Sequence, residues 1–328
     1  AGSIGGMDSL TQRMPFVTAF YRALGTGMVI SVDSPIDDKV RSAMESLIED
    51  YEHVLSRFRN DSLIAAIGKA EHGGSFDFPD WCAPLFDLYD ALFSATSGAI
   101  DPCVGEDLIR LGYDASLSFT VTQDAPEHLG ALRGRAVWGR DVTRHGTTLV
   151  THEPVQLDFG ACGKGYLVDL LGRMLQSSQF VIDAGGDLLI HAEQPISVAL
   201  EDPEDQSHAI GIAHIANGAL CASAPSRRHW NVAVNERTQI AIHHLLNAID
   251  GLPAQQTEAS WAYIPANATL NLARDYPAAV ADGLATALFV SDATQLQRTF
   301  DFAYATLNES RQIAASRNFP AELFLRSA

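Results

Sequence analysis

The sequence predicts an α+β fold, in which mixed sheets carry packed helices, built as a single large domain of two intimate lobes. Apolar residues recur at helical spacing in three stretches, over residues 36–56, 165–176 and 278–289. Short apolar runs typical of strands gather between residues 180 and 234 instead. Because these runs do not alternate regularly with helices, a parallel βαβ architecture is not favoured. The length of 328 residues is sufficient for a sizeable core.

The individual elements follow from hydrophobic period and from end signals, such as Gly98 after a helical stretch. In chain order, we expect helices over residues 36–56, 80–97, 165–176, 278–289 and 292–299. We expect strands over residues 27–32, 149–159, 180–190 with a break at the paired glycines, 196–200, 210–215, 219–223 and 231–234. Residues 105–116 are expected to form a turn-rich connection, and residues 120–147 a surface excursion.

Charge and cysteine spacing exclude several classes of protein. A net charge of −18 gives no counterion-release affinity for nucleic acid, so no nucleic-acid partner is expected. It also disfavours anionic membrane surfaces, and no stretch approaches the length of a membrane span. The cysteines show no CxxC spacing, which argues against zinc and redox motifs; they are Cys82, Cys103, Cys162 and Cys221. Cys162 is interpreted as a small buried residue rather than a nucleophile.

The first six residues resemble the remnant of a cloning tag before a native Met7, which would make residues 7–328 the domain. The residues after Met7 have no apolar signal core and no lipid-attachment cysteine. We therefore expect a cytoplasmic protein, or a periplasmic one if an export signal has been removed.

Two clusters have the residue types that hold a diphosphate and a cation. In Asp158–Tyr166, three glycines and Lys164 stand between an apolar run and a helix. Glycine permits close approach of the backbone to an anion, and the N-terminus of a helix favours negative charge. Asp282 and Thr286 are spaced i and i+4, so both oxygens share one helix face. A phosphate cradle beside a hard-cation site suggests a diphosphate substrate.

Six segments in this order resemble the motifs of the FAD:protein FMN transferases, the ApbE family, between about residues 20 and 290. Leu24-Gly25-Thr26 is similar to M-G-T, and residues 58–62 to F-x-x-D-S. Residues 96–105 resemble T-x-G-A-F-D-P-T-V-G, and residues 158–166 resemble D-L-G-G-I-A-K-G-Y, with Asp169 following. Residues 185–187 match G-G-D, and residues 281–287 resemble A-D-x-x-A-T-A.

The resemblance implies an ApbE-type fold and a Mg²⁺-dependent enzyme that takes FAD, releases AMP and attaches FMN to a Ser or Thr hydroxyl of an acceptor protein. It implies that Asp282, Thr286 and the carbonyl of Ala161 hold Mg²⁺, and that His244 is the base. It places FAD among the following residues: Leu24, Phe58, Ala99, Ile100, Asp101, Asp158, Lys164 and Leu246.

Two segments depart from the family pattern near the reacting end. H-I-I-D-P-x-T-G appears as residues 244–251, where Asn247 replaces the Asp, and T-S-G-x-Y appears as residues 222–226. These departures keep two alternatives open: an FAD pyrophosphatase that yields FMN and AMP, and a non-catalytic FAD-binding protein. If the alignment slips by one residue, His243 takes the place of His244.

Each motif alone also has an ordinary structural interpretation. The glycines can form a tight turn, Asp282 can be a solvated carboxylate at a helix N-terminus, and His244 can be a core or surface histidine. The functional interpretation therefore depends on the joint occurrence of the motifs in one order.

Overall fold

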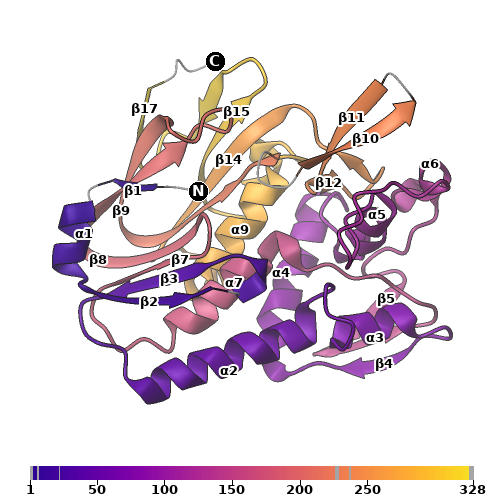
Figure 1. Cartoon of the computed structure of the whole chain (residues 1–328), viewed down its shortest axis with the longest axis horizontal. Helices are drawn as coiled ribbons and strands as arrows, with labels where there is room; N and C mark the ends of the chain where they lie inside the picture. Colours follow the sequence, from indigo (N-terminus) through magenta and orange to yellow (C-terminus); the bar gives the residue numbers. More distant parts are fainter. Residues whose placement is uncertain (1–2, 6, 22, 226–228, 236–237, 325–328) are drawn as a thin grey trace.

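A computed structural model describes residues 3–5, 7–21, 23–225, 229–235 and 238–324, and it confirms the α+β prediction (Figure 1). The large sheet has the strand order β16–β15–β14–β9–β8–β7–β3–β2, with β1 paired to β8 and β17 to β9. The strands of this sheet are β1 (Ser3–Gly5), β2 (Phe16–Phe20), β3 (Met28–Val32), β7 (Phe180–Asp183), β8 (Asp187–Glu201), β9 (Ala209–Ser223), β14 (Thr257–Pro265), β15 (Ala303–Asn308), β16 (Ile313–Ala315) and β17 (Ala321–Leu323).

Both faces of this sheet are apolar where β7, β8 and β9 pair, because successive side chains alternate between two hydrophobic clusters. Leu188 and Ile190 belong to one cluster, whereas Leu189 packs against the other. The register between β7 and β8 is set by a tight turn in which Gly185 and Gly186 have φ of 67° and 109°. The predicted break at these glycines is therefore a hairpin turn.

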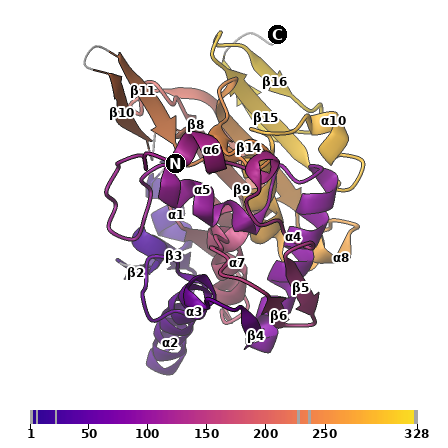
Figure 2. The same ribbon diagram turned by 90° about the vertical axis from the view of Figure 1, so that its right-hand side faces the viewer.

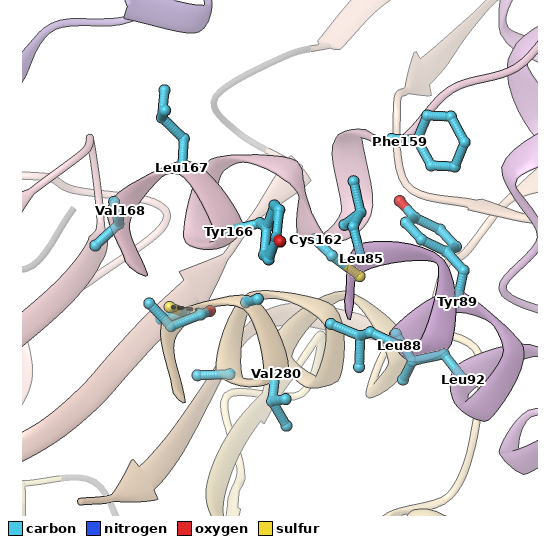
Figure 3. Packing of buried hydrophobic residues seen from close by; sticks show 14 of the residues in the cluster. Leu85, Leu88, Tyr89, Leu92, Phe159, Cys162, Tyr166, Leu167, Val168 and Val280 are labelled. Atoms are coloured by element: carbon cyan, nitrogen blue, oxygen red, sulfur yellow. Dashed lines mark hydrogen bonds between the residues drawn. The ribbon is translucent and has the colours of Figure 1, made fainter. Parts of the chain in front are cut away.

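Two helices, α7 (Gly160–Gly172) and α9 (Pro277–Ala287), form the layer beneath the sheet and are buried almost all round. α4 (Ala83–Ala95) covers them on the side away from the sheet. Figure 3 shows Leu85, Leu88 and Leu92 of α4 facing Cys162 of α7 and Val280 of α9. This packing fixes α7 and α9 against each other at the centre of the molecule.

The remaining elements surround this centre (Figure 2). The further helices are α1 (Met7–Arg13), α2 (Asp38–Leu55), α3 (Leu63–Lys69), α5 (Gly105–Arg110), α6 (Ala125–His128), α8 (Asn271–Asp275) and α10 (Ala293–Leu296). The smaller sheets are β4 (Gly74–Asp77) with β6 (Thr148–Thr151) and β5 (Val142–His145), β10 (His229–Asn235) with β11 (Thr238–His243), and β12 (Leu246–Asn247) with β13 (Leu252–Pro253). In the described part of the chain, no helix is both long and apolar enough to cross a membrane.

Several predicted elements were wrong in extent. The helix expected at 165 begins at Gly160, and the strand expected over 149–159 ends at Thr151. Residues 105–116 contain α5 rather than only turns. The short strands expected at 196–200, 210–215 and 219–223 are parts of the two long strands β8 and β9, each 15 residues long.

The segment 120–147 is also not a surface excursion, because it carries the buried residues Arg135 and Trp138. At the N-terminus, β1 pairs with Ser197–Ala199 of β8, so residues 3–5 take part in the sheet.

Candidate functional site

All twelve predicted site residues line one cavity of about 1150 Å³. It lies where the ends of α7 and α9 meet the part of the chain that contains α5 and β12. The twelve residues come from six separate segments of the sequence; they are Leu24, Phe58, Ala99, Ile100, Asp101, Asp158, Ala161, Lys164, His244, Leu246, Asp282 and Thr286. The cavity has a polar end at α7 and α9, and an aromatic end near Tyr113 and Trp230.

At the polar end, α7 and α9 hold each other through reciprocal hydrogen bonds, in which a carboxylate of each helix accepts from backbone amides of the other. Asp282 of α9 accepts a hydrogen bond from the Gly165 amide at 3.0 Å. Asp169 of α7 accepts from the amides of Ala278 and Ala279 at 3.0 and 2.8 Å, which satisfies two otherwise orphaned donors in the first turn of α9. The position of Asp282 in the cavity is therefore fixed by the helix pair itself.

Lys164 supplies the positive charge of the polar end. Its ammonium group forms an ion pair with Asp187 and lies 3.5 Å from the second carboxylate oxygen of Asp282. Both carboxylates are buried, and Asp187 Oδ1 has no hydrogen-bond partner. Burial, followed by the nearby charge of Asp187, raises the pKa of Asp282 above its usual range. The carboxylates of Asp187 and Asp282 thus share the single ammonium group of Lys164. The polar end therefore has more oxygen acceptors and more formal negative charge than Lys164 can pair.

This excess fits a small hard cation. The described residues include no group of three or more His, Cys, Asp and Glu side chains arranged to hold a metal ion. A cation bound by Asp282 would therefore need hydroxyl, carbonyl and water oxygens as its other ligands, as Mg²⁺ accepts. Thr286 and Ala161 line the cavity beside Asp282. The hydroxyl oxygen of Thr286 is 3.4 Å from that of Ser223, so its direction is constrained by a neighbour.

The glycine-rich segment has a different local structure from the one predicted, because it forms the first turns of α7 rather than a loop before it. At Gly165, an added Cβ would lie 2.1 Å from the carbonyl oxygen of Ala278 on α9. At Gly163, an added Cβ would meet only the Tyr51 hydroxyl, at 3.5 Å. Close packing of the two helices is therefore sufficient to require glycine at position 165.

The aromatic end consists of rings that the motifs did not single out. Tyr113 stacks on Trp230 with centroids 5.6 Å apart and contacts Phe58 edge-on at 5.5 Å. The guanidinium of Arg57 lies over both Phe58 and Tyr113, at 4.2 and 4.7 Å. Tyr113 and Trp230 could not be assigned from sequence because isolated aromatic residues are more often core than ligand-binding.

The structure places His244, rather than His243, at this end of the cavity. The His244 ring lies 6.4 Å from that of Tyr113 and lines the cavity. Both ring nitrogens of His243 bond to the backbone instead: Nε2 to the carbonyl oxygen of Ala254 at 2.7 Å, and Nδ1 to the Leu245 amide at 3.2 Å. Burial lowers the pKa of His243. His243 is thus a structural residue of the β11 end.

Three further predicted residues contribute mainly to the shape of the wall. Asp158 accepts hydrogen bonds from Arg57 Nε at 2.5 Å and from the Gly160 amide at 2.6 Å. Asp101 accepts from the Cys103 amide at 2.8 Å. Leu24 has a strained φ of 53°, and its amide donates to Glu52 at 2.9 Å. The two carboxylates and the Leu24 amide thus already have protein partners around the cavity.

The sequence of this chain is similar to those of known flavin transferases. The ApbE family model matches residues 24–306. The FAD:protein FMN transferase of Klebsiella pneumoniae is 22% identical over 236 residues, which is 69% of this chain and just under two thirds (66%) of that protein. The FAD:protein FMN transferase of Treponema pallidum is 27% identical over 286 residues, covering 77% of this chain and 72% of that protein.

Solved structures share the fold at low sequence identity. The ApbE protein of Thermotoga maritima superposes with a TM-score of 0.74 and 20% identity, over 93% of this chain and 99% of that one. The flavin transferase ApbE of Vibrio cholerae gives a TM-score of 0.73 and 16% identity, over 92% and 98% of the two chains. These matches confirm the fold that the motif resemblance implied.

Proposed function

Because the chain belongs to the ApbE family, we propose that it is a Mg²⁺-dependent FAD:protein FMN transferase, which moves FMN from FAD to a Ser or Thr hydroxyl of an acceptor protein and releases AMP. The observation that carries the proposal is the convergence of twelve motif residues on one cavity with an acidic end and an aromatic end. The activity in the names of the Klebsiella and Treponema relatives supports the same reaction.

The polar end would hold the cation and the diphosphate. Asp282, Thr286 and the carbonyl of Ala161 would be the protein ligands of Mg²⁺. When bound, Mg²⁺ supplies Lewis-acid stabilisation of the charge that develops on the phosphate oxygens. Lys164 is held by Asp187, so its ammonium group stays at this end when Asp282 binds a cation. From there it can contact the diphosphate as a point charge.

The aromatic end would hold the isoalloxazine ring. Leu24, Phe58, Ala99, Ile100 and Leu246 supply apolar wall beside Asp101, and the stacked rings of Tyr113 and Trp230 line the same end. Rings of this kind bind a planar heterocycle by offset stacking and by burial of its faces. The flavin half and the phosphate half of FAD would thus lie at opposite ends of one cavity.

His244 is the proposed base. Its imidazole would take the proton of the acceptor hydroxyl while the hydroxyl oxygen forms a bond to the phosphorus of the FMN half. The bond between that phosphorus and the bridging oxygen breaks, and AMP leaves with the bridging oxygen. A histidine suits this step because its ordinary pKa lies near neutrality.

A pyrophosphatase remains the second candidate, because the segment that follows His244 departs from the family pattern. Asn247 cannot carry the negative charge of the Asp it replaces, and its Oδ1 instead accepts from the Ile249 amide at 3.0 Å. Water in place of the acceptor hydroxyl would give free FMN and AMP. In the third alternative, the protein binds FAD without turnover. The acceptor protein and a cytoplasmic location are parts of the proposal.

Incubation with FAD and Mg²⁺, with and without a flavin-acceptor protein, separates these functions. Chromatography for AMP, free FMN and protein-bound FMN gives the readout. AMP together with covalent FMN on the acceptor supports the transferase. AMP together with free FMN, regardless of acceptor, establishes the pyrophosphatase. FAD recovered intact under all conditions rejects both enzymes and leaves a binding protein.

A further inference from the structure

We propose that Arg135 is a positioning residue, which holds the part of the cavity wall that carries His244. The effect of this role on catalysis rests on the proposed function. The Arg135 side chain has no exposed surface. A fully buried arginine is rare unless its charge is paired and its donors are used. Its partners therefore show what it holds.

The guanidinium contacts three separate segments of the chain, and two of its partners line the cavity. Its Nε lies 2.8 Å from Oδ2 of Asp107 on α5, in an ion pair that lacks hydrogen-bond geometry. Its Nη2 donates to the carbonyl oxygen of Ala248 at 2.7 Å, and its Nη1 lies 3.5 Å from Oδ2 of Asp101. Asp101 and Ala248 both line the cavity, and Ala248 lies in the turn that follows His244.

The two carboxylates are themselves fixed by backbone donors. Oδ1 of Asp107 accepts from the Gly130 amide at 2.8 Å, and Oδ1 of Asp101 accepts from the Cys103 amide at 2.8 Å. Because each acid has a second anchor, the guanidinium cannot shift without loss of several bonds at once. The network around Arg135 is thus a rigid joint, meaning that it connects several segments of the chain at once, whereas a single ion pair would connect only two.

The backbone around Arg135 also fits closely against the turn after His244. The amides of Ala131 and Leu132 donate to the carbonyls of Ala248 and Ile249 at 3.2 and 3.0 Å. At Gly130, which has φ of 77°, an added Cβ would lie 2.5 Å from the carbonyl oxygen of Ile249. The segment 129–136 therefore packs closely against the turn after His244 and fixes its position.

No described contact of Arg135 reaches Lys164 or Asp282, which α7 and α9 hold at the polar end of the cavity. Loss of Arg135 should therefore displace the base more than the phosphate. A misplacement of about 1 Å between reacting groups can cost roughly 100-fold in rate. Because Asp101 also belongs to the wall proposed for the flavin, we expect FAD affinity to fall as well, but less than turnover.

The test uses the double variant Arg135→Met with Asp107→Asn, which removes the buried carboxylate closest to the guanidinium together with its cation. The second carboxylate, Asp101, is 3.5 Å from Arg135 and keeps its hydrogen bond from the Cys103 amide. The control is Arg311→Met with Asp202→Asn, which removes a more exposed Arg–Asp pair that does not line the cavity. Arg135→Lys is the second variant: it keeps the charge, but its single nitrogen cannot span Asp107 and Ala248 as the guanidinium does.

Four measurements decide the outcome: thermal unfolding, the FAD dissociation constant, AMP release at saturating FAD and Mg²⁺, and hydrogen–deuterium exchange of residues 244–251. We expect both Arg135 variants to release AMP about 10- to 100-fold more slowly than the control. Exchange in residues 244–251 should be faster, and FAD affinity should fall by a smaller factor than AMP release. Wild-type turnover and exchange in a folded Arg135 variant would overturn the proposal. If no variant and no wild type releases AMP, the proposed function fails, and exchange alone still tests the positioning role.

Discussion

Substitution of Gly165 by alanine should separate the packing role of the glycine motif from an anion-binding role. An added Cβ would lie 2.1 Å from the carbonyl oxygen of Ala278 and 2.9 Å from the amide nitrogen of Ala279, whereas ordinary contact begins at 3.4 Å. The backbones of α7 and α9 would have to move apart by about 1.3 Å. That movement also lengthens the hydrogen bond from the Gly165 amide to Asp282, which is 3.0 Å.

The expected cost follows from these contacts. Overpacking typically costs 1–3 kcal/mol, and a weakened hydrogen bond to a charged group adds about 1.5–3 kcal/mol. Alanine returns about 1 kcal/mol of helix propensity. We therefore expect Gly165→Ala to lower the free energy of unfolding by about 3 kcal/mol. Gly163→Ala, in the same helix, should be neutral or stabilise by up to about 1 kcal/mol, because its Cβ has an ordinary contact.

Urea unfolding followed by far-ultraviolet circular dichroism measures both variants, with the slope of the transition as a check on the unfolded state. Binding of Mn²⁺, as a probe of the cation site, should weaken in Gly165→Ala but not in Gly163→Ala. Equal stability of the two variants would refute the packing argument. If Gly165→Ala kept full stability and lost only FAD affinity, the anion-binding interpretation of the glycine would be right.

The remaining predictions concern the polar residues of the cavity. Mg²⁺ affinity should fall as the pH decreases, starting well above pH 4, because burial raises the pKa of Asp282 and a proton then competes with the cation. The variant Asp282→Ala should show no Mg²⁺-dependent turnover, and an unchanged Mg²⁺ dependence would exclude Asp282 as a ligand. Lys164→Met should weaken binding of FAD more than binding of riboflavin, measured by flavin fluorescence; an equal loss would indicate general misfolding. His244→Ala should slow AMP release by roughly 10²–10⁴-fold with little change in FAD affinity, and a loss of affinity alone would contradict its role as base.

The long buried helices and the order of motifs were predictable because they depend on local pattern. α9 carries apolar residues on every face, so its existence follows from composition alone, whatever it packs against. α2 begins at an Asp37 cap and keeps a helical period for 18 residues. The twelve candidate site residues were found because each motif has a fixed internal spacing, which survives at low overall identity.

The start of α7 could not be predicted in the same way. Three glycines in residues 160–165 each cost about 1 kcal/mol of helix propensity, so local preference argues against a helix there. The helix forms because α9 lies against it, and the same close approach requires glycine at position 165. A partner more than 100 residues away in the sequence thus overrides local propensity, as the hydrogen bond between Gly165 and Asp282 shows.

The two ends of the cavity therefore depend on different kinds of structure. The polar end is held by close contact of two helices, in which glycine permits the approach and carboxylates cap the amides. The turn that follows His244, at the aromatic end, is held by the buried Arg135, whose partners Asp101 and the Ala248 carbonyl are 34 and 113 residues away in the sequence. Because no described contact of Arg135 reaches Lys164 or Asp282, a defect at one end should leave the other end intact. Cation binding and base positioning are consequently separable by mutation, and each can be lost without the other.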